Sequence, residues 1–506
     1  MNDTRAQHWA DSITHELLQT QSRHLISTGI TPSGEYHVGH LREILTAEAV
    51  FKALGDQGAE VRLNYIADSM DPLRRVYDFL DPALYASQVG KPLCDIPCPC
   101  GRHDSYAAHF LEPFLEAMAR LGIALEVIHA DALYRQGGLD AQILTALAHT
   151  ETIKRILHEE TGKAEAADWS PYNPLCQACG RLTTTQVVGF DTTARTVSYT
   201  CDCGHQATAP VATGGKLAWR IDWPARWHAL GVTVEPFGKD HASRGGSYDT
   251  GKRIMREVFG GEPPYPIPYE WIALQGQGDM SSSKGNLVSM FNLTQTVPPE
   301  VVRYMVFRVK PMRRIVFDPG LPLLNLVDEY DNVQGSNRNV RAAELSRIAG
   351  IPPVGVPFKH LVNLVQIAGG DLDQIIAILQ RNNLPVPDRA ILQNRLAYAE
   401  HWLTHFCPPD MRLELQDVLP AGAADLAPPQ RQALALLHQR LQPEMDGDAI
   451  HTLVYAIAEE VALPAKEVFE AVYVAFLDQR RGPRLGWFLS SLDFTFVQTR
   501  LQEAAG

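Results

Sequence analysis

A strand, a turn-rich loop, a helix and a second strand follow one another near the start of this chain. Residues 24–30 and 61–66 have the apolar, β-branched character of strands, and between them Leu41, Ile44 and Leu45 recur at helical spacing. A strand, a helix and a second strand within about 40 residues form half of a nucleotide-binding fold, whose ligand edge lies where the first strand meets the helix. The sequence therefore predicts an α/β, Rossmann-like domain with its site at that edge.

The rest of the chain divides into four regions by pattern. Residues 91–209 interrupt the alternation with clustered cysteines and glycines, which indicates an inserted module. Strand-like segments resume afterwards, so the catalytic domain is predicted to consist of residues 1–90 and 210–290. Residues 291–345 have the pattern of a helical connection. Residues 346–506 keep apolar positions at helical spacing and are predicted to form an all-α C-terminal body.

Two histidines bracket a glycine at the predicted start of the first helix. His37 and His40 are three residues apart and therefore face the same side of a helix. A helix N-terminus supplies backbone donors and positive potential, which suit the phosphates of ATP. Gly39 would let a nucleotide approach the backbone, and Pro32 and Gly34 belong to the turn before it. Taken alone, this pattern is equally compatible with ordinary surface or core histidines.

A hydroxyl-rich segment lies far downstream, at the other end of the predicted α/β domain. Met280, Ser281, Ser282, Ser283 and Lys284 combine hydroxyl groups with one ammonium, which suits binding a triphosphate as pyrophosphate leaves. Alone, this segment is also compatible with a flexible linker. Both segments together, in this order, favour a site for ATP and its accompanying Mg²⁺.

Seven of the eight cysteines lie in two short stretches. A Cys-x-x-Cys pair and a Cys-x-Cys pair form the first group, which is Cys176, Cys179, Cys201 and Cys203. This spacing is typical of a structural zinc ribbon, and the alternative is four reduced cysteines without metal. The looser second group comprises Cys94, Cys98, Cys100, His103 and His109. For the second group, a second zinc site and no metal at all are both left open.

The net charge and the lack of a secretion signal or apolar span indicate which classes of protein this chain resembles. The net charge of −13 is unlike that of a small nucleic-acid-binding module, but a large acidic enzyme can still carry local basic patches. One basic run contains no acidic residue, and its cations are Arg303, Arg308, Lys310, Arg313 and Arg314. On charge alone, a nucleic-acid contact and a solvated face are equally open. The sequence contains neither a secretion signal nor an apolar run of about 18 residues, so we expect a cytoplasmic protein without a membrane partner.

The two nucleotide motifs resemble those of the class I aminoacyl-tRNA synthetases. That family has a His-Ile-Gly-His type motif, which residues 37–40 fit almost completely, and a Lys-Met-Ser-Lys-Ser type motif. In the second motif Asp279 and Ser282 occupy the two lysine positions. The triple serine followed by Lys284 resembles the variant of the class I lysyl-tRNA synthetases, in which a lysine just after the serines takes over the phosphate role.

The wider resemblance to class I lysyl-tRNA synthetases spans most of the chain, through the blocks 28–34, 219–227, 235–241 and 480–486. It implies that the chain activates lysine with ATP and transfers it to tRNA(Lys). Carboxylates and aromatic faces are expected around the lysine ammonium. The implied lysine-pocket residues are Gly29, Thr31, Glu35, Trp219, Asp222, Asp240, His241 and Tyr269.

The resemblance also implies a division of labour on tRNA. The inserted module is expected at the acceptor end of tRNA and the helical body at the anticodon, with the basic run touching tRNA as well. We expect the enzyme to be a monomer.

Three other functions remain open on the sequence. Glutamyl-tRNA synthetases share one sequence block, but they usually have an arginine where this chain has Ser27, which cannot pair with an acidic substrate. An adenylate-forming paralogue that does not use tRNA is the second alternative. A tRNA-binding paralogue without activation is the third, supported by Asp279 and the acidic net charge.

Overall fold

The computed structural model describes residues 8–280, 287–336, 338–348 and 354–506. The chain forms two compact units. The first unit consists of Met1–Thr294, Pro299–Phe317 and Asn339–Ile348, and the second of Gln295–Pro298, Asp318–Arg338 and Ala349–Gly506. The segment 291–345, predicted as one helical connection, is therefore shared between the two units.

A five-stranded parallel sheet with the order β10-β9-β1-β2-β3 forms the framework of the first unit. Its strands are β1 (Arg23–Ile30), β2 (Glu60–Ala67), β3 (Glu126–His129), β9 (Val234–Gly238) and β10 (Tyr265–Tyr269). The chain order reverses at β1, which has β2 on one side and β9 on the other. Ligands of such sheets bind beyond the carboxyl ends of the strands at this reversal. The predicted α/β domain with a parallel sheet is confirmed.

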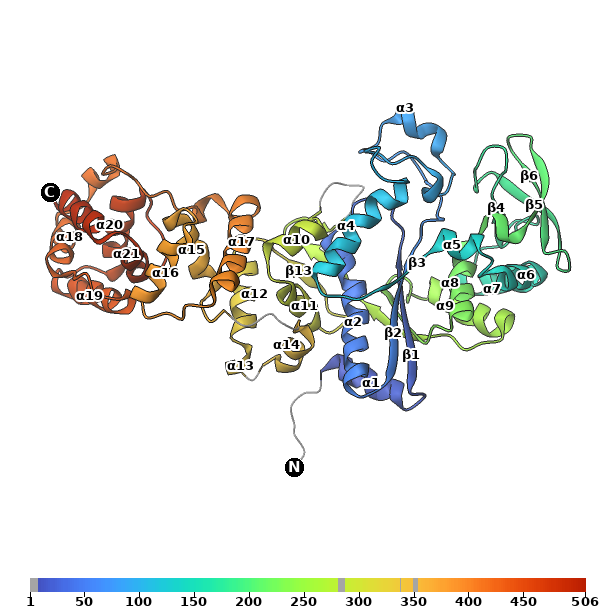
Figure 1. The fold of residues 1–506 in the computed structure, drawn as a ribbon, viewed down its shortest axis with the longest axis horizontal. Coiled ribbons are helices and arrows are strands. Elements are labelled where there is room, and N and C mark those ends of the chain that lie inside the picture. Colours follow the sequence, from blue (N-terminus) through green and yellow to red (C-terminus); the bar gives the residue numbers. More distant parts are fainter. Residues whose placement is uncertain (1–7, 281–286, 337, 349–353) are drawn as a thin grey trace. The chain divides into compact units, whose positions relative to one another are not determined.

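Helix α2 (Leu41–Asp56) packs along β1 and β2 (Figure 1). Its apolar positions Leu41, Ile44 and Leu45 are fully buried, as the periodicity predicts. A single helical turn, η1 (Val38–His40), precedes it and carries the two histidines. Helix α1 (Trp9–Leu18), at the start of the described chain, also packs against α2.

The region predicted as one inserted module, residues 91–209, is not continuous. Strand β3 lies inside it but pairs in parallel with β2, with Asn64 opposite Glu126. Only four residues long and flanked by helices, β3 lacks a strand pattern strong enough to identify from sequence. Between β2 and β3 the chain forms α3 (Pro82–Tyr85), η2 (Ala86–Gln88), η3 (Leu93–Asp95) and α4 (Tyr106–Arg120).

After β3 the chain forms helices and then a small antiparallel sheet. The helices are α5 (Ala130–Arg135), α6 (Asp140–Ala148) and α7 (Thr150–Thr161). The three-stranded sheet consists of β5 (Thr185–Asp191), β6 (Thr196–Cys201) and β7 (Gln206–Pro210), and a separate pair consists of β4 (Tyr172–Pro174) and β8 (Gly215–Leu217). The first cysteine group lies in this region, between β4 and β7.

The first unit contains further helices and strands, most of them after β8. They are α8 (Trp219–Leu230), α9 (Ser247–Ile254), η5 (Met255–Phe259), β11 (Ile272–Leu274), β12 (Gly278–Asp279), α11 (Pro299–Phe307), β13 (Ile315–Phe317) and α14 (Val340–Ser346). Strand β11 pairs with both β12 and β13. Helix α10 (Met290–Thr296) begins in this unit.

Every element in the described part of the second unit is helical. Its α-helices are α12 (Leu321–Asp331), α13 (Val333–Ser336), α15 (Phe358–Ala368), α16 (Leu372–Arg381), α17 (Arg389–His405), α18 (Pro428–Arg440), α19 (Gly447–Glu460), α20 (Ala465–Leu477), α21 (Leu485–Ser491) and α22 (Phe494–Ala505). Helices α18 to α22 share one apolar core, in which Leu434, Val454 and Val472 are fully buried. Along the described ranges, no helix combines the length and apolar character needed to cross a bilayer.

Candidate active site

The carboxyl ends of three strands, β1, β9 and β10, bring together five of the eight residues predicted for the lysine pocket. Gly29 lies at the end of β1, and Thr31 follows it. Asp240 and His241 follow β9, and Tyr269 ends β10 directly opposite Gly238. Because parallel strands end at one edge of the sheet, the topology alone brings these five residues to the same edge.

The rings of His37 and His40 lie against each other with their centroids 3.9 Å apart and their planes tilted by 31°. Nδ1 of His37 accepts a hydrogen bond from the Gly39 N–H at 3.1 Å, and Nδ1 of His40 accepts one from the His37 N–H at 3.1 Å. A backbone N–H can only donate, so a neutral ring here must carry its proton on Nε2. Burial lowers the pKa of His37 to about 4, and it also lowers the pKa of His40 well below its usual value. Both rings are therefore neutral donors at physiological pH.

Gly39 is required by its neighbour. A Cβ atom at this position would lie 2.7 Å from Cε1 and 2.8 Å from Nδ1 of His37. Real Cβ atoms do not approach other atoms that closely, so any side chain at Gly39 would displace the His37 ring. The sequence suggested that Gly39 leaves room for a nucleotide. The structure shows that Gly39 also leaves room for the ring of His37.

The hydroxyl-rich segment is adjacent to the histidines at its downstream end. Ser281, Ser282, Ser283 and Lys284 lie outside the described residues, whereas Met280 before them is buried. After them, the Val38 N–H donates to the Val288 carbonyl at 3.0 Å, and the Met290 N–H donates to the Tyr36 carbonyl at 3.1 Å. The two motifs, far apart in sequence, are therefore tied together by the backbone.

Glu43 on helix α2 is a site residue that the sequence analysis did not select. Its half-buried carboxylate accepts a hydrogen bond from the Gly29 N–H at 2.9 Å and another from the Tyr269 hydroxyl at 2.8 Å. Burial raises the pKa of Glu43 to about 7, and the nearby Asp68 and Asp240 charges add to this rise. One signal could have identified it, because Glu43 follows His40 by three residues and stands among the buried apolar positions of α2.

Aromatic rings line the β9 side of the same edge. Trp219 stacks on Trp223 with centroids 5.5 Å apart, and the His241 ring lies 6.0 Å from Trp219 and 5.4 Å from Trp223. Trp219 keeps 40% of its surface exposed, so one face is open to a ligand. Behind these rings Glu235 accepts hydrogen bonds from two indole N–H groups, and burial raises its pKa to about 8.

Asp222 is a correction to the predicted lysine pocket. It is completely buried, and its two oxygens accept hydrogen bonds from Tyr134, Lys216 and Arg226. Those cations also pair with Asp68. Burial opposes ionisation of Asp68, but the charges of Arg226 and Lys216 hold its pKa at about 2. Asp222 thus belongs to a buried ionic network, and its local sequence block did not reveal the distant members Tyr134 and Asp68.

Thr31 is held by the same network. Its hydroxyl donates to Asp71 Oδ2 at 2.7 Å, and Lys216 approaches Asp71 at 3.0 Å. The hydroxyl proton is committed to Asp71, so the Thr31 oxygen has only lone pairs left and can only accept from a ligand.

Glu35, the carboxylate chosen from sequence to bind the lysine ammonium, lies elsewhere. It is exposed and lines a cavity of about 430 Å³ together with Arg102, His103 and His109. It does not join the Gly29–Glu43–Tyr269 group. Pro32 is buried and Gly34 is half-buried in the loop between β1 and η1. The direction of the Glu35 side chain depends on how this loop folds, which its spacing from His37 could not predict.

The basic run is only partly on the surface. Arg303 is buried, forms an ion pair with Glu48 and donates to the Leu121 carbonyl at 3.0 Å, so its predicted contact with nucleic acid is wrong. Arg308 is half-buried beneath Tyr304. The exposed cations of the run are Lys310, Arg313 and Arg314. A run of charged residues in the sequence does not show which of them are buried. Arg303 lies on helix α11, with its side chain in the interior.

The four ribbon cysteines converge on one point. Their sulfur atoms all lie within 4.8 Å of one another, with 3.6 Å between Cys176 and Cys203 and 3.7 Å between Cys179 and Cys201. Thiolates around tetrahedral zinc at about 2.3 Å would be about 3.8 Å apart. The donor set therefore fits zinc, in a closed site without a position for water.

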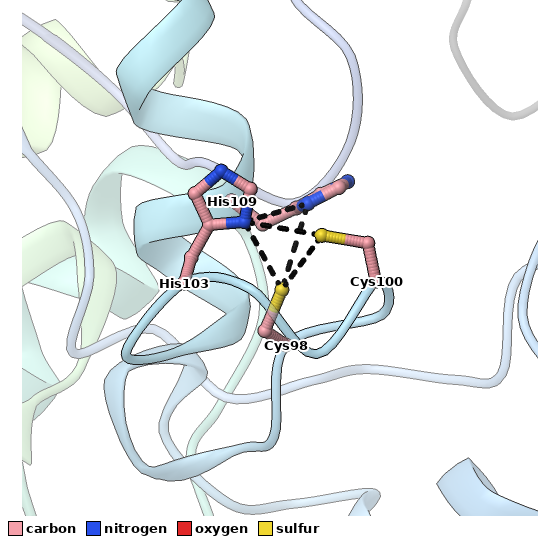
Figure 2. Close-up of side chains that lie close together, drawn as sticks. All are labelled: Cys98, Cys100, His103 and His109. Carbon is pink, nitrogen blue, oxygen red and sulfur yellow. Dashed lines mark hydrogen bonds between the residues drawn. The ribbon is translucent and has the colours of Figure 1, made fainter.

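The second group also converges, without Cys94 (Figure 2). The sulfurs of Cys98 and Cys100 are 3.4 Å apart, and Nδ1 of His103 lies 3.2 Å from each. Nδ1 of His109 lies 3.6 Å from the Cys98 sulfur and 3.3 Å from Nδ1 of His103. Two thiolates and two imidazoles at these separations also fit tetrahedral zinc.

Comparisons with known proteins identify a family model and several relatives that this chain is similar to. A family model described as tRNA synthetases class I (K) matches residues 7–350. A lysine--tRNA ligase of Methanosarcina barkeri is 48% identical, with 98% of each chain covered. A lysine--tRNA ligase of Archaeoglobus fulgidus is 45% identical, over 98% of this chain and all of that protein. A solved glutamate-tRNA synthetase of Elizabethkingia anophelis aligns over 96% of this chain and 99% of its own, at 12% identity and a TM-score of 0.43.

Proposed function

The chain belongs to the class I lysyl-tRNA synthetase family, and from this premise we propose that it activates lysine with ATP and transfers it to tRNA(Lys). The observation that carries the substrate assignment is Glu43, an anionic group between Gly29 and Tyr269 at the carboxyl edge of the sheet. A carboxylate there suits a substrate with a cationic side chain and repels glutamate. ATP–pyrophosphate exchange with lysine, arginine, ornithine and glutamate tests the assignment, and a preference for glutamate would overturn it.

The lysine pocket combines charge with an aromatic wall. Glu43 pairs with the substrate ammonium, and Asp240 adds negative potential nearby. Trp219 and His241 provide ring faces for the aliphatic stem of lysine. The Thr31 oxygen, which can only accept, takes one further hydrogen bond from a substrate amine.

Activation requires no covalent enzyme intermediate. The lysine carboxylate attacks the α-phosphorus of ATP, the bond to the bridging oxygen breaks, and pyrophosphate leaves with Mg²⁺. The terminal ribose hydroxyl of tRNA then attacks the activated carbonyl, and AMP leaves. Catalysis consists of positioning and of stabilising charge on the phosphates. The Nε2–H groups of His37 and His40 donate to the phosphates, and Lys284 stabilises the leaving pyrophosphate.

The ribbon cysteines hold a structural zinc ion. Cys176 and Cys179 precede β5, Cys201 ends β6 and Cys203 lies in the turn before β7, so one ion would tie the loop before β5 to the β6–β7 turn at one end of this small sheet. Its contribution is to folding, since four thiolates saturate the ion.

Metal analysis checks both cysteine groups at once. The purified protein is expected to contain two zinc ions per chain, one for each group. The double variant Cys176→Ser/Cys179→Ser should lose one of them and keep lysine-dependent pyrophosphate exchange within about twofold, because the ribbon is not part of the histidine loop. A wild-type chain without zinc would contradict the proposal.

The second unit carries a tRNA-binding cavity. The cavity has a volume of about 560 Å³. Trp487 and His360 form one wall with ring centroids 5.0 Å apart, and Lys359, Arg481 and Arg484 lie at the cavity. An aromatic wall with surrounding cations is how proteins bind an unstacked base and its phosphates. This arrangement supports the expected anticodon contact in the helical body.

Variants at this cavity should weaken tRNA binding selectively. Trp487→Ala should raise the KM for tRNA(Lys) about tenfold or more, since stacking contributes about 1–3 kcal/mol per base, and Trp487→Phe should restore most of it. Arg481→Ala should flatten the salt dependence of tRNA binding, and so should Arg313→Ala/Arg314→Ala in the basic run. The matched control is Arg440→Ala, an exposed cation of the same unit paired with Glu460. An unchanged tRNA KM in the Trp487 and Arg481 variants would remove the cavity from tRNA recognition.

A further inference from the structure

We propose that the metal ion of the Cys98–Cys100–His103–His109 group positions the histidine loop of the active site, acting through helix α4. The inference rests on the proposed function, because it concerns the loop expected to bind ATP. It assigns this cluster a task beyond local stability and distinguishes it from the ribbon zinc.

The cluster is built around the start of α4. Cys98, Cys100 and His103 come from the loop before the helix, whereas His109 lies in its first turns. Binding one ion therefore cross-links the loop to the helix. A carboxylate on the same helix supports the site, because Glu112 lies 3.4 Å from Nε2 of His103, the ring nitrogen that does not face the cluster. Such carboxylates orient metal-binding histidines and strengthen the bond to the metal.

Helix α4 holds the histidine loop directly. The hydroxyl of Tyr106, the first residue of α4, donates to the Ser33 carbonyl at 2.8 Å. Two turns later Phe114 stacks on Tyr36 with centroids 4.4 Å apart and an interplanar angle of 26°. Tyr106 and Phe114 are both buried. These contacts fix the loop at two points, before His37 and immediately next to it.

The second contact continues to the histidines themselves. The Tyr36 ring lies 5.4 Å from the His40 ring, and its hydroxyl shares a 2.7 Å hydrogen bond with the Tyr65 hydroxyl on β2. The Tyr36 carbonyl also accepts from Met290, just after the hydroxyl-rich segment. A shift of α4 would therefore move both the histidine pair and the neighbouring motif. A displacement of about 1 Å in catalytic groups can lower the rate about 10²-fold.

The cavity described for Glu35 lies between the cluster and the loop. Its lining includes His103 and His109 of the cluster and Tyr36 and Phe114 of the contact with the loop. With an open space on this side, the loop depends on the α4 contacts for its position more than a fully packed loop would. The ribbon group, in contrast, lies at one end of the β5-β6-β7 sheet, between the loop before β5 and the β6–β7 turn.

The test compares a variant that loses the metal ion with a variant that loses only the hydrogen bond from Tyr106 to Ser33. His109→Ala should contain one zinc fewer and show an exchange kcat about 10²-fold lower, while the KM for lysine changes less than twofold. Tyr106→Phe should keep both zinc ions and lower kcat about tenfold, because it loses only the hydroxyl that holds Ser33. His109→Cys, which keeps four donors, should restore zinc and most of kcat. The double variant Cys176→Ser/Cys179→Ser is the matched control, since it loses a zinc ion elsewhere.

Hydrogen–deuterium exchange supplies a readout that does not depend on activity. Amides of residues 33–40 should exchange faster in His109→Ala than in wild type and should be unaffected in the ribbon variant. If His109→Ala loses zinc while kcat and loop protection both remain at wild-type values, or if Tyr106→Phe has wild-type kcat, the proposal is wrong. Failure of the proposed function would look different, because the wild-type enzyme would then show no lysine-dependent exchange.

Discussion

Glu43→Gln is expected to lower kcat/KM for lysine about 10²–10³-fold. The substitution keeps size and one acceptor but removes the charge opposite a desolvated ammonium, and truncating one partner of such a buried pair costs about 2–5 kcal/mol. The hydrogen bonds from Gly29 and Tyr269 would lose their ionic acceptor at the same time. Pyrophosphate exchange at varied lysine concentration measures the loss, and the KM for ATP should change little.

The same carboxylate predicts a pH dependence. Because the pKa of Glu43 is raised to about 7, the group is protonated below that pH in the free enzyme and cannot balance an ammonium. The value of kcat/KM for lysine should therefore fall about tenfold for each pH unit below 7 and level off above it. Glu43→Gln should remove this step, whereas Glu235→Gln, which tests another carboxyl with a raised pKa, should keep it.

Glu35→Gln is the matched control for charge removal. Glu35 is an exposed glutamate near the histidines but outside the Gly29–Glu43–Tyr269 group, so exchange should stay within about threefold of wild type. If Glu35→Gln is severely impaired and Glu43→Gln is not, Glu35 is the carboxylate that pairs with the lysine ammonium, as the sequence predicted, and the proposed pocket around Glu43 is wrong.

His40→Asn should lower kcat for adenylate formation about 10²–10³-fold, the range for loss of one preorganised donor to a developing anion. Lysine binding should be spared, because the residues proposed to bind lysine do not include the histidine pair. Since His37 and His40 act as one pair in ring contact and joined by a hydrogen bond, the double variant His37→Asn/His40→Asn should be little worse than the more damaged single variant. Single-turnover adenylate formation separates this step from product release.

The neutral state of the two histidines is itself testable. An ordinary histidine would titrate near pH 6.5, but burial lowers the pKa of both rings well below that. In Glu43→Gln, where the carboxyl step is absent, kcat/KM for ATP should show no step between pH 6 and 7. A residual step in that range that disappears in His40→Asn would show that a protonated imidazole does the work instead.

Local patterns predicted the elements around the site well. The strand and helix signals of residues 24–66 correspond to β1, η1, α2 and β2, because apolar spacing records directly which face of each element is buried. The spacing of the four ribbon cysteines likewise anticipated their convergence. The histidine pair stands at a helix start, as its position after a turn-rich loop indicated.

The sequence was less informative about which charged side chains are buried and which residues they pair with. Asp222 and Arg303 look like available charges in their own segments, yet each is buried against a partner far away in the chain, Tyr134 for the first and Glu48 for the second. Strand β3 was missed because a four-residue segment obtains its identity from pairing with β2. Burial of a charge depends on which distant groups can compensate its desolvation, and no local window contains that information.

The sequence therefore predicted the kind of fold and the clusters of candidate residues. The tertiary structure decided which individual residues lie together at the candidate site. Short-range spacing alone predicted an α/β domain, the convergence of the four ribbon cysteines and a helical body. The choice of Glu43 over Glu35 came only from the sheet order, which places β10 and Tyr269 beside the helix that carries Glu43. The link from a metal cluster through α4 to the histidines also exists only in three dimensions, because it is made of contacts such as Tyr106 to Ser33 between residues far apart in the chain.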